Sequence, residues 1–446
     1  MIKSIPIIDR LIICIGSIFI LTAILINEWT LAVLFCPDGI PSHIRTNFRI
    51  YNIVLISIGT LLIVFRKKNF TRNLCLLLCS ILVTFIMTEF YFRMFDPHEH
   101  FRSEHSIFFE YNDTLGWQLI PNKSGVFSSK NEFRSVVTIN SAGMRDSNRQ
   151  INKTNGEKRI AVLGDSFTAG MNVDDKDVFT KILENVLLKN AEVLNFGVNG
   201  YGPTQEYLLL KSKALHYEPD LVVMVIYMGN DFDDIVGLSD LFDGYKRPQA
   251  VLNKRDKIDL INIPIPRTED RNFRKKDHAC DLPQSHLVNF FDKCLHELKK
   301  NKYVVENMPT ELRICKKNPD KQTIDAFNLM RSIVNKTNFL CKKNGCRFMV
   351  IAAPTIVQVY NNVFWPKIVK KYNLNTDNYD LEAPNKALAK MCEILDIPFL
   401  DLTLALRDAA RKGDNVYYYE NQHWNRKGHH VVAETISKFI ESNHLF

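Results

Sequence analysis

The amino-acid sequence predicts an α/β domain, in which helices cover both faces of a parallel sheet, preceded by a membrane region. Two observations predict this architecture. From Arg159 onward, short apolar runs alternate with segments of helical periodicity. Before Arg93, three stretches of apolar, uncharged residues follow one another. Hydrophobic residues make up 46% of the 446 residues and charged residues 24%, which excludes a disordered or collagen-like chain.

The predicted strands are rich in β-branched and large apolar residues and show little polar alternation. This pattern is typical of parallel strands that are buried on both faces. The strands are expected at 159–163, 192–196, 220–227, 347–352 and 397–401.

Between these strands, apolar residues recur at the spacing that places them on one face of a helix. One helix is expected to start near Asp175 and to reach residue 187. A second spans 324–340, with Gly345 as the glycine that follows its end. A third is entered through Pro384 and reaches residue 395, and the last runs from about 427 to 440.

The apolar stretches predict three transmembrane helices, at about 11–36, 50–65 and 73–90. A spanning helix needs roughly 20 residues, so the second and third depend on flanking polar side chains that reach the membrane surface. A cleaved signal peptide would explain only the first stretch. Buried helices of a soluble protein are the other alternative.

Basic residues indicate the orientation of these helices. They crowd the short loop between the second and third stretches, at Arg66, Lys67, Lys68 and Arg72. Since such loops stay in the cytoplasm, the N-terminus is expected there too, and everything after about Arg93 is expected outside, in the periplasm or extracellular space. In that compartment six cysteines could form disulfides or remain buried thiols. They are Cys280, Cys294, Cys315, Cys341, Cys346 and Cys392.

The chain is therefore expected to divide into a membrane region (1–96), a linker leading into the domain (97–150) and the α/β domain (151–446). An insertion is expected at about 232–320, with helical hints between 287 and 300. The net charge of +8 is spread thinly, so no nucleic-acid partner is expected. Asp277, His278 and Cys280 are close in sequence but lack a second pair of ligands, so no metal site is expected there. No cofactor is expected.

Four motifs could carry chemistry. Gly164-Asp165-Ser166 follows the first strand, a glycine-rich turn at 195–202 follows the second, and Gly229-Asn230-Asp231 follows the third. His423 precedes the last helix. Taken singly, each has a structural explanation as a helix cap, a turn or a buried histidine. Taken together, they would gather at the carboxyl edge of the sheet, where open α/β folds place their sites.

The residue types suit acyl transfer. A serine hydroxyl attacks esters poorly unless an imidazole takes its proton, and the resulting oxyanion needs neutral N–H donors aimed at it. Competing motifs fail on inspection. The sequence has no Gly-Lys-Ser/Thr of a nucleotide-binding loop, Thr168 stands where an α/β-hydrolase elbow needs glycine, and the glycines at 197–202 have the wrong order for a dinucleotide site.

In this order and spacing, the four motifs resemble those of the SGNH hydrolase (GDSL-type esterase) superfamily, over about residues 110–445. Leu115-Gly116-Trp117, the segment 140–145 and His423-Trp424-Asn425 are similar to bacterial membrane-attached members. The resemblance implies a flavodoxin-like three-layer α/β/α sandwich with a central parallel sheet. It also implies Ser166 as the nucleophile, His423 as the general base, and an oxyanion hole formed by the N–H groups of Ser166 and Gly200 and the side chain of Asn230.

The sequence departs from the family beside the histidine. Glu420 stands three residues before His423, where the family usually has aspartate, and Asn421 stands two before. Glu420 is therefore the expected orienting acid, while Asn421, as a neutral acceptor, and a backbone carbonyl remain alternatives.

The expected function is that of a membrane-embedded serine ester hydrolase, which removes O-acyl or O-acetyl groups from a glycan or lipid outside the cytoplasm. One alternative is an O-acetyltransferase that modifies a cell-surface polysaccharide. Three spans are too few to contain a multi-span acyl-donor module, so this alternative requires either a soluble acyl donor or an acyl-donor or polysaccharide-export partner protein. The other alternative is a non-catalytic membrane scaffold with a degenerate hydrolase fold.

Overall fold

The structure is a computed structural model that describes residues 6–25, 30, 42–95, 107–129, 132–153, 156–188, 191–237, 241–242, 245–253, 258–267, 285 and 310–445. The chain forms two compact units. The first contains Met1–Arg102 with Asp270–Val304, and the second contains Ser103–Glu269 with Val305–Phe446.

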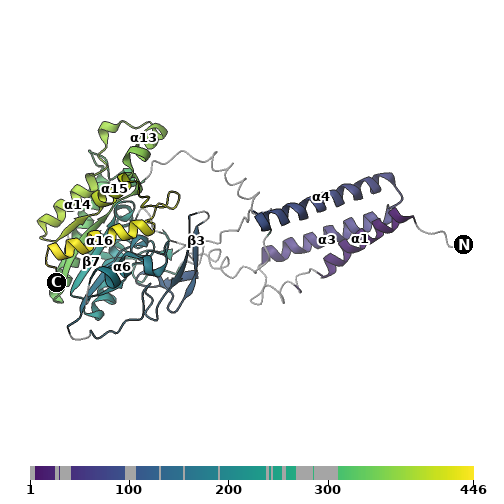
Figure 1. Cartoon of the computed structure of the whole chain (residues 1–446). Coiled ribbons are helices and arrows are strands. Elements are labelled where there is room, and N and C mark those ends of the chain that lie inside the picture. The colour runs from purple at the N-terminus through teal and green to yellow at the C-terminus, as the bar shows by residue number, and fades with distance from the viewer. Residues whose placement is uncertain are drawn as a thin grey trace. The chain divides into compact units, whose positions relative to one another are not determined.

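Three helices make up the described part of the first unit: α1 (Ile7–Leu25), α3 (Ser42–Val64) and α4 (Asn69–Phe95) (Figure 1). The helices α1 and α3 meet at two glycines. A Cβ atom on Gly16 would lie 2.8 Å from the carbonyl oxygen of Gly59, and one on Gly59 would lie 2.6 Å from that of Gly16. Only glycine at both positions allows the two backbones to come this close.

Among the described residues, α1 is the one helix that is long and apolar enough to cross a membrane. The apolar parts of α3 and α4 are shorter, at Arg49–Val64 and Ser80–Tyr91, because both helices begin with polar turns. The first predicted span, 11–36, starts inside α1 and continues past Leu25 into residues outside the described part. One N-terminal apolar helix is thus established, while a multi-pass topology and its orientation stay predictions.

The second unit is built on a five-stranded parallel sheet in the order β13-β12-β7-β5-β6. In chain order the strands are numbered 2-1-3-4-5 across the sheet, which is the flavodoxin-like order. The predicted fold class is confirmed, and each strand lies within two residues of its predicted bounds. The strands are β5 (Lys158–Leu163), β6 (Ala191–Asn195), β7 (Leu221–Tyr227), β12 (Arg347–Ala353) and β13 (Phe399–Asp401).

Successive residues of each strand belong to opposite hydrophobic cores. Leu163 and Met224 lie in one core, whereas Val162 and Val223 lie in the other. This explains the nearly continuous apolar runs, because a strand covered on both faces has no face for polar side chains.

Helices form the outer layers of the sandwich (Figure 1). The first core contains side chains of α7 (Pro203–Ser212), α11 (Lys321–Lys343) and α14 (Ala383–Ile394). The second contains those of α6 (Phe179–Ile182), α15 (Thr403–Arg411) and α16 (Arg426–Ser442). The predicted glycine after α11 is confirmed, since Gly345 follows the C-cap with φ 74°. The helix predicted from Asp175 to residue 187 forms three short pieces. Val178 adopts extended dihedrals and separates the first piece from the second, which continues at Leu183 into a turn of π-helix.

Residues 107–150, which the sequence assigns to a linker, form two antiparallel hairpins. The first pairs β1 (Phe109–Asn112) with β2 (Gly116–Leu119), and the second pairs β3 (Ser124–Ser129) with β4 (Phe133–Thr138). Their buried side chains join the first core of the sheet. The segment is thus packed into the domain, since its turn-forming residues separate short strands as readily as they interrupt a linker.

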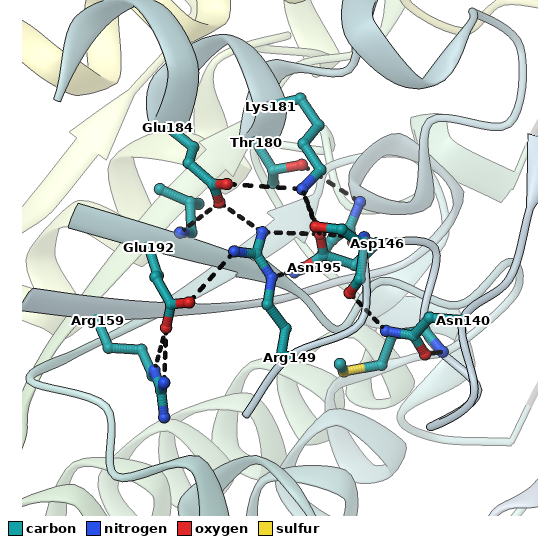
Figure 2. A network of polar contacts seen from close by, with 12 residues as sticks. Asn140, Asp146, Arg149, Arg159, Thr180, Lys181, Glu184, Glu192 and Asn195 are labelled. Atoms are coloured by element: carbon teal, nitrogen blue, oxygen red, sulfur yellow. Dashed lines mark hydrogen bonds and ion pairs between the residues drawn. The ribbon is translucent and has the colours of Figure 1, made fainter. Parts of the chain in front are cut away.

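A network of charged side chains ties the end of this segment to the sheet (Figure 2). Arg149 lies 2.8 Å from Asp146 and 2.5 Å from Glu184, while Glu192 lies 2.6 Å from Arg159. Burial lowers the pKa of Arg149, but the hydrogen bonds and charges of Asp146 and Glu184 outweigh this and raise it above its ordinary value. Charges buried to this extent are stable only when paired, and here each has a partner of opposite sign.

In the range 232–320, the described residues include two small hairpins rather than one continuous element. The helical hints between 287 and 300 lie outside the described residues, as do Asp277, His278, Cys280 and Cys294. Cys315, Cys341, Cys346 and Cys392 are buried free thiols.

The remaining short elements connect these parts. They are α5 (Ser166–Ala169), η2 (Asp175–Asp177), η3 (Leu183–Leu187), η4 (Ala214–Tyr217), α8 (Asp231–Asp234), β8 (Leu241–Phe242), β9 (Tyr245–Lys246), β10 (Gln249–Leu252), β11 (Ile258–Ile261), η5 (Thr310–Leu312), α12 (Ile356–Val359), α13 (Asn361–Tyr372) and η6 (Thr376–Asn378).

Candidate active site

The candidate site lies where the strand order of the sheet reverses. From β5 the chain crosses to β6 on one side and then returns to β7 on the other side of β5. In doubly wound α/β proteins the loops after neighbouring strands diverge at such a reversal, and ligands bind there at the carboxyl edge of the sheet. Ser166 follows β5, Gly200 follows β6 and Asn230 follows β7.

Ser166 is the first residue of the four-residue helix α5. The side chain of Asp165 caps this helix by accepting a hydrogen bond of 2.8 Å from the N–H of Phe167, and Gly170, with φ 62°, ends it. A Cβ on Gly164 would lie 2.1 Å from the Thr168 hydroxyl. The glycine in the Gly-Asp-Ser motif is thus required by the sharp turn that presents the serine.

The structure brings Ser166 and His423 together across 257 residues of sequence. The Ser166 Oγ lies 2.7 Å from the His423 Nε2, and the His423 Nδ1 lies 2.9 Å from the backbone carbonyl oxygen of Asn421. A carbonyl oxygen only accepts, so Nδ1 carries the hydrogen and Nε2 offers its lone pair to the serine hydroxyl. The imidazole also stacks on Phe167, with ring centroids 4.7 Å apart.

The acceptor at Nδ1 is main chain, whereas the sequence favoured the side chain of Glu420. The Glu420 side chain is exposed, and its N–H donates to Glu132 Oε1 at 2.8 Å. The N–H of Asn421 donates to the other oxygen of Glu132, also at 2.8 Å. Of the three acceptors considered from the sequence, the backbone carbonyl is the one that lies beside the Nδ1, because the loop turns the Asn421 carbonyl toward the ring.

The glycine-rich turn is held against the nucleophile helix. Asn195 donates to the carbonyl of Thr168 at 3.0 Å and accepts from the N–H of Gly197 at 2.9 Å. Gly200 has φ 76°, which favours glycine. The indole N–H of Trp117 donates to the carbonyl of Asn199 at 3.0 Å, so the first hairpin braces the residue before Gly200.

Asn230 comes directly before α8. Its side-chain amide donates to Asp234 Oδ2 at 2.6 Å, and Arg247 Nη1 lies 2.9 Å from the same oxygen. An amide group carries two hydrogens, so this bond uses one and fixes the direction of the other. The positive charge of Arg247 therefore offsets the charge of the carboxylate that orients the amide.

Several carboxyl groups are buried around these motifs. Burial raises the pKa of Asp165 to about 7 and raises the pKa of Glu206 and Asp231 well above their ordinary values. Burial also raises the pKa of Asp234, against the opposing effect of Arg247. The second histidine of the late motif, His429, is buried as well, which lowers its pKa to about 3. It is a neutral structural residue whose Nδ1 accepts from the N–H of Phe179.

Sequence analysis missed the supporting roles of Glu132 and Arg247, and quoted Arg145 only as part of a motif. Arg145 donates to the carbonyls of Ala169 at 2.9 Å and Val173 at 2.6 Å, which holds the chain after the nucleophile helix. No local signal marks Glu132 or Arg247, because both act on residues far away in the sequence. Among the described residues, no group of three or more histidine, cysteine or acidic side chains could hold a metal ion.

In comparisons with known proteins, the chain is similar to solved structures but matches no sequence family. An acetyl xylan esterase variant from Geobacillus stearothermophilus is 11% identical, with a TM-score of 0.33, over 65% of this chain and 97% of that one. A lipase/acylhydrolase from Enterococcus faecalis is 12% identical, with a TM-score of 0.32, over 64% of this chain and 96% of that one. No protein-family model and no curated protein matches the sequence. The fold class therefore stands on the observed strand order.

Proposed function

We propose that the chain is a serine ester hydrolase, with Ser166 as nucleophile and His423 as general base. The observation that carries this proposal is the 2.7 Å contact between the Ser166 hydroxyl and the His423 Nε2, at the carboxyl edge of the sheet. A serine with an imidazole acceptor at this distance is an activated nucleophile, and the acceptor at Nδ1 keeps the ring in the required tautomer.

The reaction follows from these positions. The Ser166 Oγ attacks the ester carbonyl carbon while its proton passes to the His423 Nε2. The oxyanion that forms is stabilised by the N–H groups of Ser166 and Gly200 and the free hydrogen of the Asn230 amide, and losing one such donor typically costs about 3 to 4 kcal/mol. The intermediate collapses as the Nε2 proton moves to the leaving alcohol. Water, deprotonated by His423, then releases the acid from the acyl-enzyme.

The proposal also covers the substrate class, the location of the domain and the acceptor of the acyl group. The substrate class is an O-acyl or O-acetyl ester of a glycan or lipid, and the domain acts outside the cytoplasm while α1, together with α3 and α4, holds it in the membrane. If a sugar hydroxyl replaces water in the second half-reaction, the same residues transfer the acyl group, which then comes from a partner protein or a soluble donor. The apolar helix α1 supports the membrane attachment.

The test is hydrolysis of a chromogenic acetyl ester by the detergent-solubilised full chain, compared with Ser166→Ala. We expect turnover in the parent protein, labelling by a fluorophosphonate probe, and loss of both in the variant. Equal turnover in the two proteins would refute the assignment, and failure to label would favour the scaffold alternative. Adding an acceptor sugar and measuring acylated sugar against free acid separates transferase from hydrolase.

A further inference from the structure

We propose that Glu132, beside the start of β4, is the positioning residue for His423, acting through the backbone of residues 420 and 421. In a serine–histidine–acid arrangement the carboxylate contacts the imidazole directly. Here the carboxylate binds the loop whose carbonyl contacts the imidazole. The inference rests on the proposed function, which supplies the role of His423.

One carboxylate binds two consecutive amides of this loop. Glu132 Oε1 accepts from the N–H of Glu420, and Oε2 accepts from the N–H of Asn421, both at 2.8 Å. Hydrogen bonds to an ionised acceptor are roughly twice as strong as neutral ones, and two at once fix the orientation as well as the position of the backbone. The contact joins parts of the chain that are 288 and 289 residues apart.

Glu132 is one of several contacts that hold this loop. The amide of Asn172 donates to the Asn421 side chain, and the N–H of Gln422 donates to the carbonyl of Tyr418 at 2.9 Å. Among the described residues, Glu132 is the one whose side chain accepts from the N–H groups of residues 420 and 421, whereas the side chains of Glu420 and Gln422 are exposed and bury little surface. Gln422 has φ 61°, a left-handed conformation that costs a non-glycine residue about 1 kcal/mol or more. The Asn421 carbonyl must nevertheless stay 2.9 Å from the His423 Nδ1. Glu132 restrains the residue that bears this carbonyl.

The same hairpin also contacts the loop after the nucleophile. The ring of Phe133 lies 5.1 Å from that of Tyr418, and the N–H of Val136 donates to Asp174 at 3.2 Å. The Ser135 hydroxyl donates to the carbonyl of Met171. The hairpin β3–β4 therefore spans both loops of the site and sets the histidine loop relative to the serine loop.

A glutamine at position 132 can keep only one of the two hydrogen bonds that the carboxylate accepts, and it leaves the size of the side chain almost unchanged. Its NH₂ group would face an N–H donor, so one of the two backbone amides loses its acceptor. We expect Glu132→Gln to lower kcat for a chromogenic acetyl ester by about 10- to 100-fold, with KM changed by less than about twofold, because Glu132 is not expected to touch substrate. Glu434→Gln, which removes the same charge from an exposed site on α16, is the matched control and should behave like the parent protein.

Two readouts separate positioning from a loss of folding. The first is chemical rescue, in which formate restores part of the kcat of Glu132→Ala while chloride at equal ionic strength does not. The second is the pKa of His423, measured by NMR on the ¹⁵N-histidine-labelled full chain and assigned with His423→Asn. Removing a nearby negative charge disfavours the imidazolium, so the pKa of His423 should fall in Glu132→Gln and stay unchanged in Glu434→Gln.

These measurements distinguish failure of the Glu132 inference from failure of the proposed esterase function. If the parent protein shows no Ser166-dependent turnover, the proposed function fails, and the NMR comparison alone decides the role of Glu132. An unchanged His423 pKa with kcat within twofold of the parent value overturns the inference. So does a kcat loss that only matches the loss of folded protein and is insensitive to formate.

Discussion

The carbonyl oxygen of Asn421 lies 2.9 Å from the Nδ1 of His423, on the side of the ring opposite the Ser166 hydroxyl. A main-chain acceptor fixes the tautomer of the imidazole as a carboxylate would. It provides less electrostatic stabilisation of the imidazolium, because a carbonyl carries a partial rather than a full negative charge. The contribution of each acidic side chain near the loop to catalysis must therefore be tested separately.

Replacing Glu420 by glutamine should change kcat/KM by less than about threefold. The exposed Glu420 carboxylate is screened by solvent, and exposed charges contribute little. The measurement is the pH dependence of ester hydrolysis in both proteins. A loss of a hundredfold or more would instead make Glu420 the orienting acid that the sequence favoured.

Removing Ser166 and His423 should not have additive effects. Each alanine variant should lose at least about a thousandfold in kcat, and the double variant should lose no more than the worse single variant, because the two groups act as one unit. Steady-state kinetics of the two single variants and the double variant test this. Additive losses would mean that the 2.7 Å contact is not used in the reaction.

Removing only one partner of the Asp234–Arg247 ion pair should lower the free energy of unfolding. Both side chains are almost completely buried, so Arg247→Gln leaves a buried carboxylate without a cation, which costs about 3 to 5 kcal/mol of unfolding free energy. The double variant Asp234→Asn with Arg247→Gln should recover part of this loss. Urea denaturation of Asp234→Asn, Arg247→Gln and the double variant measures the coupling, and a double variant no more stable than Arg247→Gln contradicts it.

Asn230→Ala should lower kcat by about a hundredfold or more while leaving folding intact, since it removes the side-chain donor proposed for the oxyanion. Asn230→Asp should be at least as damaging, because a carboxylate offers no N–H and brings a negative charge close to Asp234. Kinetics with circular dichroism as the folding control test this. Full activity in Asn230→Ala would remove Asn230 from the oxyanion hole.

Stability should fall as the pH rises from about 4 to about 7. Asp165 has its pKa raised from 3.8 to about 7 in the folded protein, so in this window the folded state holds a proton that the unfolded state has lost. Each such group contributes a slope of about 1.4 kcal/mol per pH unit. Asp165→Asn should flatten the curve and be more stable than the parent at pH 8, with the difference shrinking toward pH 4. Denaturation at several pH values checks the sign.

Local patterns in the sequence determined the five strands of the sheet and the helices α11, α14 and α16, whereas α7, α15 and the strands of the hairpins were not predicted. The strands of the sheet are buried on both faces, so their apolar runs identify them without any knowledge of neighbours. Gly345 ends α11 for a reason that lies within the helix itself. The positions of Ser166 and Asn230 shortly after strands also follow from local order, which is why the edge of the sheet at which they lie could be predicted.

The tertiary structure alone decided how these parts meet. That β5 lies between β6 and β7, that the hairpins of 107–150 enter the core, and that a carboxylate at 132 binds amides at 420 and 421 are relations over tens to hundreds of residues. Periodicity and turn chemistry report only a residue's immediate surroundings. The acceptor for His423 illustrates the limit, because a backbone carbonyl is present at every position and only the folded path of the loop selects the one at 421.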